Sequence, residues 1–147
     1  MLTSGVGVSP FDLVSFDNAL IDAGLSNYNL LRVSSILPMQ CQEAGVISQK
    51  EGSLISAAYG FISSNVHGDV ISSAIGVGIP ENKNQVGVIM ECAGHYSAEE
   101  AKRRITEMTC EAMKNHKIPC KEIKVSSAEA HVSGEEYITV LSAVAMW

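Results

Sequence analysis

The chain has 147 residues, the size of one domain, and 46% of them are hydrophobic, which is enough for a core. Its net charge of −6 at pH 7 and the lack of a strong basic cluster argue against nucleic-acid binding. No apolar run is long enough to span a membrane, and the four cysteines lack the spacing of a zinc site or a disulfide framework. We therefore expect one domain over residues 1–147, without a metal and located in the cytoplasm.

The first part of the chain predicts a strand, a helix and a second strand. Residues 1–14 are typical of a short strand or loop. A helical pattern begins at Ser15, which can act as the N-cap, and ends at Gly24, a residue common just after helices. Residues 27–37 then have the pattern of a strand, which Pro38 would end.

The middle of the chain predicts an antiparallel meander. Residues 39–52 are polar and irregular and indicate a surface loop. Three strand patterns follow in succession, at 53–65, 70–79 and 85–93. The residues His67–Gly68–Asp69 are typical of a tight turn between the first two strands. We expect strands that are neighbours along the chain to pair with each other.

The last part predicts one long helix and a hairpin. Ser97, followed three residues later by Glu100, has the pattern of a capping box at the start of a helix that runs to about His116. Four residues mark its apolar face: Ala101, Ile105, Met108 and Ala112. Residues 121–132 and 136–146 are then expected to form a hairpin.

Two helices and six or seven strands predict an α+β fold of stacked, mainly antiparallel sheets with outer helices. A second sheet is needed because two helices cannot cover all the apolar strand faces. No repeat, dinucleotide-binding motif, P-loop or nucleophile elbow is present.

Two stretches together resemble the pyruvoyl-dependent arginine decarboxylases: FDNALIDAGLSNYNLLRVSSILP at 16–38 and GVIMECAG at 87–94. The segments AAYGFISS and GDVISSAIGVGIP between them fit the same family. The specific part is Asn-x-x-Arg-x-Ser-Ser, since the chain has three other Ser-Ser pairs outside this context. Met39 and Cys92–Ala93 depart from the family pattern, which bears on substrate preference but not on the Ser-Ser pair or on Glu91.

The resemblance implies a cofactor and a reaction. Decarboxylation of an amino acid leaves electrons at Cα that side chains cannot accept. The family implies that a covalently bound pyruvoyl group derived from Ser35 accepts them. The Ser35 hydroxyl would attack the Ser34 carbonyl, and elimination and hydrolysis would leave a β chain, 1–34, and a pyruvoyl-bearing α chain, 35–147. The implied reaction converts L-arginine to agmatine and carbon dioxide.

The family also implies two residues with roles near the reaction. Asn29 would line the active site, where its amide could stabilise an oxyanion or orient the substrate. The alternative is a satisfied polar residue at a strand start. Glu91 would donate a proton to Cα, and its place after the apolar run 86–90 favours partial desolvation of the carboxyl. The alternative is a sheet-end glutamate that faces water.

Substrate binding is implied for three further residues. Asp17 would pair with the substrate guanidinium, and the carbonyl of Leu20, one turn along the helix, could accept a further N–H. An acidic residue in the first turn of a helix is also favoured by the helix dipole. Ser34 would contribute its new carboxylate after cleavage. Arg32 is expected to be structural, and Tyr59 to line the pocket or the core.

The resemblance implies a four-layer αββα sandwich. Family members assemble as homo-oligomers, so it also implies a trimer of cleaved protomers, or a multiple of it, with active sites between subunits. Two alternatives stay open. The same machinery could act on another amino acid, such as histidine or ornithine. The chain could instead be an uncleaved, non-catalytic assembly subunit with the same fold. A role in polyamine metabolism or in acid resistance is also left open.

Overall fold

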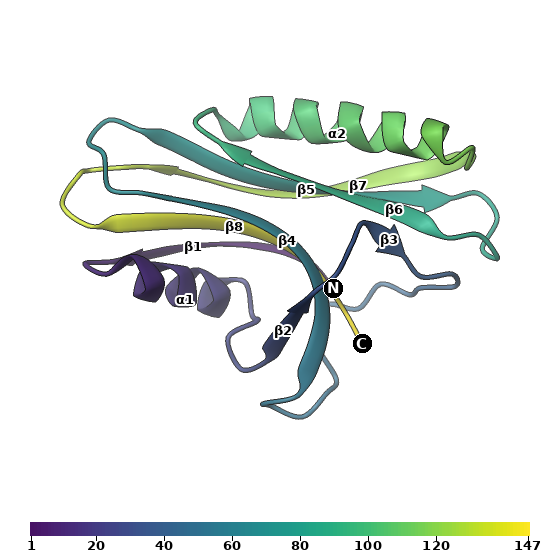
Figure 1. The fold of residues 1–147 in the computed structure, drawn as a ribbon, viewed down its shortest axis with the longest axis horizontal. Helices are drawn as coiled ribbons and strands as arrows, with labels where there is room; N and C mark the ends of the chain where they lie inside the picture. The colour runs from purple at the N-terminus through teal and green to yellow at the C-terminus, as the bar shows by residue number, and fades with distance from the viewer.

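The computed structural model describes residues 1–147 and shows two helices and two four-stranded sheets (Figure 1). One sheet has the strand order β1-β8-β4-β2 and the other β3-β6-β5-β7. The elements are β1 (Leu2–Ser9), α1 (Asp12–Asp22), β2 (Asn29–Arg32), β3 (Ile36–Leu37), β4 (Leu54–Ser64), β5 (Val70–Pro80), β6 (Gly87–Gly94), α2 (Ala98–Asn115), β7 (Cys120–His131) and β8 (Tyr137–Met146).

The helices lie on different sheets. Figure 1 shows α2 along the sheet of β5, β6 and β7, and α1 against β1 and β8. All strand pairs are antiparallel except β2 with β4, which is parallel. The fold is therefore α+β with two mainly antiparallel sheets, as predicted, and the arrangement is compatible with a sandwich.

The central strands are buried on both faces. Every residue from Ile138 to Ala145 of β8 is buried, and so is every residue from Ile71 to Gly78 of β5. One apolar cluster joins the two sheets, with Ala58 and Val144 from the first and Ile75 from the second. The predicted second sheet is present, and this apolar contact between the sheets is compatible with a sandwich.

Pairs of glycines let each helix lie close to its sheet. A Cβ added to Gly7 of β1 would stand 2.1 Å from the carbonyl oxygen of Ser15 in α1, and one added to Gly5 would stand 2.4 Å from that of Ala19. On the other sheet, a Cβ at Gly76 of β5 would stand 2.4 Å from Thr109 Oγ1 in α2. Both helices therefore dock where a strand carries no side chain.

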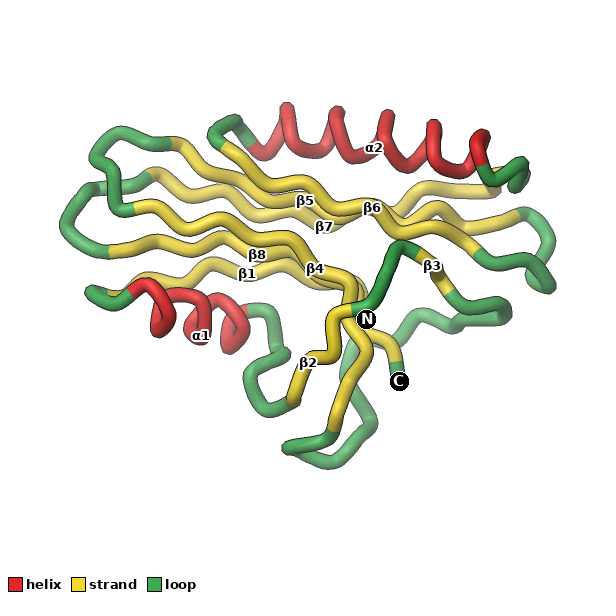
Figure 2. Tube along the Cα trace, viewed as in Figure 1, coloured by secondary structure: helices red, strands yellow, loops and turns green.

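The predicted meander and hairpin are wrong in their pairing. β4 and β5 belong to different sheets, and so do β7 and β8; only β5 and β6 pair as predicted. Figure 2 shows both connections as loops that pass from one sheet to the other. They are joined by hydrogen bonds from Gly68 N to Val132 O (3.0 Å) and from Val132 N to Asp69 O (2.9 Å). A strand pattern in the sequence indicates which residues of the strand are buried. The partner of that strand, however, depends on residues that are distant in the sequence.

Two predictions in the first 40 residues need correction. Helix α1 begins at Asp12, so Ser15 is not the N-cap; it is buried, and its hydroxyl lies 2.6 Å from Thr139 Oγ1 of β8. The predicted strand 27–37 is two short strands, β2 and β3, in different sheets. The chain crosses from sheet to sheet between them.

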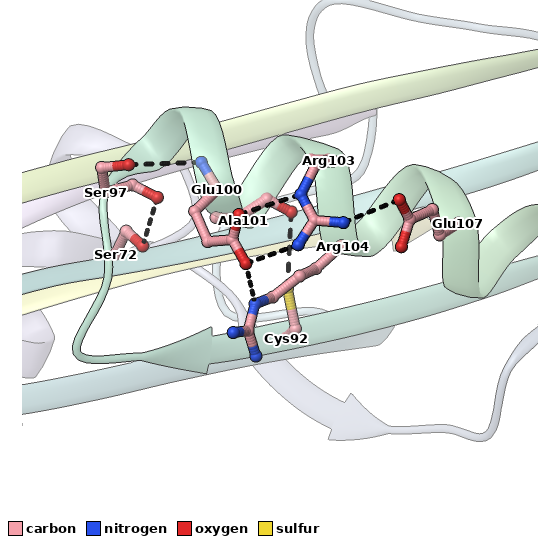
Figure 3. Close-up of polar contacts among 8 residues, drawn as sticks. All are labelled: Ser72, Cys92, Ser97, Glu100, Ala101, Arg103, Arg104 and Glu107. Carbon is pink, nitrogen blue, oxygen red and sulfur yellow. Dashed lines mark hydrogen bonds and ion pairs between the residues drawn. The ribbon is translucent and has the colours of Figure 1, made fainter.

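Helix α2 begins as predicted. The Ser97 hydroxyl accepts a hydrogen bond from Glu100 N at 3.2 Å (Figure 3). The Glu100 carboxylate points along the helix to Arg103 and Arg104, at 2.7 and 2.6 Å. The buried face is a row at spacing four: Ala101, Ile105, Thr109 and Met113. The prediction was right for the first two, but Met108 is 40% exposed and Ala112 is only half-buried.

None of the helices combines the length and the apolar character that crossing a bilayer requires. All four cysteines are unpaired. The cytoplasmic location stays a prediction.

Candidate active site

The Ser34–Ser35 bond lies in the segment that crosses between the sheets. Before it, Val33 N donates to Ala57 O of β4 at 3.1 Å. After it, Ser35 O accepts from Ile89 N of β6 at 2.8 Å. The chain is thus held to one sheet just before the bond and to the other just after it. Ser34 is exposed and Ser35 half-buried, so the bond is not part of the core.

A surface pocket of about 370 Å³ adjoins the Ser34 side of this bond. Its walls include Val33, Ile36, Met146 and Trp147. Trp147 is held in place by a hydrogen bond from its ring N–H to Ser48 Oγ at 2.9 Å. The crossing segment therefore borders open space.

Arg32 and Glu91 form an ion pair between the two sheets beside this crossing. Arg32 Nη2 lies 3.4 Å from Glu91 Oε1 and donates to the carbonyl of Tyr59 at 3.0 Å. Its guanidinium lies 5.0 Å from the centre of the Tyr59 ring. Arg32 is 55% exposed and Glu91 29% exposed. The predicted structural pairing of Arg32 on a sheet face is thus a contact with Glu91 on the other sheet.

Glu91 lies close to the predicted cleavage site along β6. It follows Ile89 by two residues, and Ile89 is the residue whose N–H binds Ser35 O. Two strand residues span about 7 Å. Glu91 also lies inside the strand, paired with Ile75, and a Cβ at Gly60 of β4 would stand 3.2 Å from its Cβ and Cγ. It is therefore not a sheet-end residue that faces only water.

Three aromatic rings, those of Tyr59, Phe61 and Phe16, connect Arg32 to helix α1. Phe16 lies 4.7 Å from Phe61 and 6.5 Å from Tyr59, measured between ring centres. Tyr59 is the ring that Arg32 covers. Sequence reasoning missed Phe16 and Phe61 as neighbours of the site. A signal was present, because Tyr59 and Phe61 are two residues apart on a predicted strand and so share a face.

Asn29 lies at the start of β2, where its side-chain amide donates to Gly52 O at 2.8 Å. No hydrogen bond joins it to Ser34, Ser35 or Glu91 within the chain. This geometry corresponds to the alternative of a satisfied polar residue at a strand start. A direct role of Asn29 in catalysis stays a prediction.

Asp17 and Leu20 lie on α1, next to Phe16 in the aromatic cluster. Asp17 is exposed and forms no ion pair within the chain, so its carboxylate is available to a cation. The Leu20 carbonyl accepts from Leu25 N at 2.8 Å, which leaves one of its two lone pairs. Nothing within one chain joins these two residues to Ser34.

The opposite face of β6 is closed by α2. Burial raises the pKa of Tyr96 to about 12, and its neighbour Cys92 acts in the same direction. The Arg104 guanidinium, 4.8 Å from the Tyr96 ring centre, opposes this rise. Tyr96 is thus neutral at physiological pH, and the ionic groups of the site lie on the Glu91 face.

Comparison with known proteins gives consistent matches. A protein-family model described as "Pyruvoyl-dependent arginine decarboxylase (PvlArgDC)" matches residues 1–147. A protein of that name from Methanocaldococcus jannaschii is 41% identical over 107 residues, which cover 73% of this chain and 65% of the relative. That match spans slightly less than two thirds of the relative's length. Proteins of the same name from Methanococcus aeolicus and Pyrococcus abyssi are 33% and 37% identical, over 99% and 90% of this chain and 87% and 84% of theirs.

These matches define an enzyme of the carboxy-lyase class. The chain belongs to the pyruvoyl-dependent arginine decarboxylase family. The resemblance noted from residues 16–38 and 87–94 is thereby confirmed. The family name implies a pyruvoyl cofactor.

Proposed function

We propose that this chain decarboxylates L-arginine to agmatine and carbon dioxide, after cutting itself between Ser34 and Ser35. The family match over the whole chain carries the proposal. The position of the Ser34–Ser35 bond supports it, because a bond between two sheets can break without removing a strand from either.

The cleavage follows from the two serines. The Ser35 hydroxyl oxygen bonds to the Ser34 carbonyl carbon, the peptide C–N bond breaks, and the hydroxyl proton ends on the Ser35 nitrogen. Loss of the Cα proton of Ser35 then expels the Ser34 carboxylate and leaves dehydroalanine. Water converts this residue to pyruvoyl and ammonia. No oxidant is required, and both chain ends stay tied to their own sheets.

The residues present fit a pyruvoyl group at position 35. The Ser35 carbonyl is held by Ile89 N, and Glu91 lies two residues further along β6. When formed, the group supplies the electron sink that decarboxylation needs. Glu91, in its protonated form, is the proposed proton donor to the substrate Cα, and Arg32 Nη2, 3.4 Å from Oε1, positions its carboxyl group.

Substrate recognition is proposed for Asp17, the Leu20 carbonyl and the new carboxylate of Ser34. The free carboxylate of Asp17 suits a guanidinium, which forms paired charge-assisted hydrogen bonds. Since Asp17 and Ser34 are not joined within one chain, a site shared between copies would bring them together. We therefore propose a homo-oligomer, a trimer or a multiple of it, built on a four-layer αββα sandwich.

Denaturing mass spectrometry of the purified chain tests the proposal. We expect fragments for residues 1–34 and 35–147, the second blocked at its N-terminus and reactive toward a carbonyl-trapping reagent. A Ser35→Ala variant should stay whole and form no agmatine. A Ser127→Ala variant provides a matched control, because it alters a different Ser-Ser pair at a half-buried position of β7.

Product assays separate the substrate alternatives. Agmatine, histamine and putrescine are measured side by side with arginine, histidine and ornithine as substrates. Agmatine as the main product supports the proposal. Histamine or putrescine as the main product would instead identify histidine or ornithine as the substrate. An unprocessed chain without any product would instead identify a non-catalytic assembly subunit.

A further inference from the structure

The three residues Ser34, Ser35 and Ile36 form a tight turn closed by one hydrogen bond. Ile36 N donates to Ser34 O at 3.0 Å. This is the only hydrogen bond that the Ser34 carbonyl oxygen makes within the chain. The turn is held from outside as well, through Val33 N to Ala57 O and through Ile89 N to Ser35 O.

The N–H of Ile36 is free for this contact because of its register in the sheet. Ile36 pairs with Val88 in an antiparallel ladder, while the ladder hydrogen bond runs from Ile89 N to Ser35 O. Ile36 is therefore a non-hydrogen-bonded position, whose N–H points away from β6. The sheet does not use this donor, and the turn directs it at the carbonyl that the proposed cleavage attacks.

We infer that the backbone N–H of Ile36 is the oxyanion donor for self-cleavage. The inference rests on the proposed cleavage between Ser34 and Ser35. When the Ser35 hydroxyl oxygen bonds to the Ser34 carbonyl carbon, negative charge develops on the Ser34 oxygen. An oxyanion donor has to lie about 2.7–3.1 Å from the position that the charged oxygen takes up, and the Ile36 N–H is already directed at this oxygen from 3.0 Å before the reaction.

The side-chain amide of Asn29 is the other donor considered for this oxygen. In the chain it donates to Gly52 O at 2.8 Å and has no contact with Ser34. The backbone donor needs no rearrangement to reach the oxygen, whereas the amide does. The first step of processing is therefore assigned to a main-chain group that no substitution except proline removes.

The test removes this donor alone. The α-hydroxy analogue of isoleucine, placed at position 36 by cell-free translation, replaces the N–H with an ester oxygen and keeps the side chain. Ile36→Pro removes the same N–H by a simpler route, and Ile36→Val keeps it as the matched control. Cleavage is followed by denaturing mass spectrometry, with circular dichroism to confirm folding. Hydroxylamine is added in parallel, because it releases fragment 1–34 from the ester formed in the first step. It also cleaves the backbone ester of the variant, but that fragment ends at residue 35 and is distinguished by its mass.

We expect the ester variant to cleave about 100-fold to 1,000-fold more slowly, as is typical when one oxyanion donor is lost, and Ile36→Val to cleave at the normal rate. Hydroxylamine should release little fragment 1–34 from the ester variant, since the donor acts before the intermediate forms.

A normal cleavage rate in the ester variant would overturn the inference and leave the proposed function standing, even if Ile36→Pro were slow through a change of shape. A slow ester variant from which hydroxylamine releases fragment 1–34 would also overturn it, by placing the defect after the first step. Failure of the unmodified chain to cleave would overturn the proposed function, and the inference with it.

Discussion

At the scale of single residues, Gly60 controls the space beside Glu91. A Cβ at this position would lie 3.2 Å from Glu91 Cβ and Cγ, closer than packed carbon atoms normally approach. We expect Gly60→Ala to lower the kcat for agmatine formation about tenfold, because a displaced catalytic group loses its alignment. Steady-state assays normalised to trapped carbonyl measure it. Gly45→Ala, where no atom lies within 4 Å, is the control, and an unchanged kcat in Gly60→Ala would contradict the role given to Glu91.

Glu100 is the residue whose titration should affect stability. Hydrogen bonds from Arg103 and Arg104 lower its pKa from 4.5 to about 2. The stabilisation is therefore present above about pH 4.5 and is lost as the pH falls through about 2. Its size should be small, because the pairs lie on the surface.

Urea unfolding at a series of pH values checks this effect on the uncleaved Ser35→Ala chain. The unfolding free energies of this chain and of its Glu100→Gln derivative should differ at neutral pH, and the difference should shrink below about pH 4.5 and disappear as the pH falls through about 2. Glu99→Gln is the matched control, since Glu99 is also in the first turn but forms no ion pair. A difference that did not change with pH would argue against the ion pairs as its cause.

At the scale of elements, the docking of α1 depends on the glycines of β1. A Cβ at Gly7 would stand 2.1 Å from Ser15 O and 2.3 Å from Ala19 N, so the helix would have to move. Gly7→Ala should destabilise the uncleaved Ser35→Ala chain by about 1–3 kcal/mol, the usual effect of overpacking. The urea midpoint measures it, with Gly45→Ala again as control. A midpoint within error of the control would contradict the close approach of α1.

The helices and strands also show which element boundaries local sequence patterns can predict. Helix α2 could be predicted almost to the residue, because Ser97 and Glu100 mark its start within four positions. The start of α1 could not, because Phe11 caps it without a side-chain hydrogen bond and Ser15 is instead buried against Thr139. The strand 27–37 was predicted whole because its apolar residues continue through the crossing. What divides it is the pairing of its two halves with β4 and β6, which are distant in sequence.

At the scale of the whole molecule, the fragment 1–34 is built into the first sheet. Its strand β1 pairs with β8 along all eight residues, from Leu2 with Val144 to Ser9 with Tyr137. Ala19 of its helix and Ala23, which follows the helix, belong to the core of that sheet. Cleavage between Ser34 and Ser35 therefore breaks one bond and leaves these contacts in place.

We expect both fragments to stay together after cleavage. Native mass spectrometry or gel filtration should recover them in equal amounts as one particle, and only a denaturant should separate them. The uncleaved Ser35→Ala chain should elute at the same volume. Release of fragment 1–34 in plain buffer would contradict the placement of β1 and α1.

Part of the candidate site could likewise be predicted from local sequence, and part depends on contacts between residues that are distant in the sequence. The Asn-x-x-Arg-x-Ser-Ser motif and Glu91 could be recognised as residue types in sequence, because a reaction of the main chain needs adjacent serines. The contact of Arg32 with Glu91 could not, because they lie 59 residues apart on different sheets. The roles of Asn29, Asp17 and Leu20 stay predictions.

By itself, the sequence determined which segments become strands and helices, and it identified the family through Ser34, Ser35 and their neighbours. Hydrophobic periodicity, helix-capping residues and sequence motifs are local properties, so they can be recognised without the rest of the molecule. Only the tertiary structure decided which strands pair, where the chain crosses between sheets, and that a spare backbone N–H faces the Ser34 carbonyl. These depend on hydrogen bonds between segments far apart in the chain, and no local pattern encodes them.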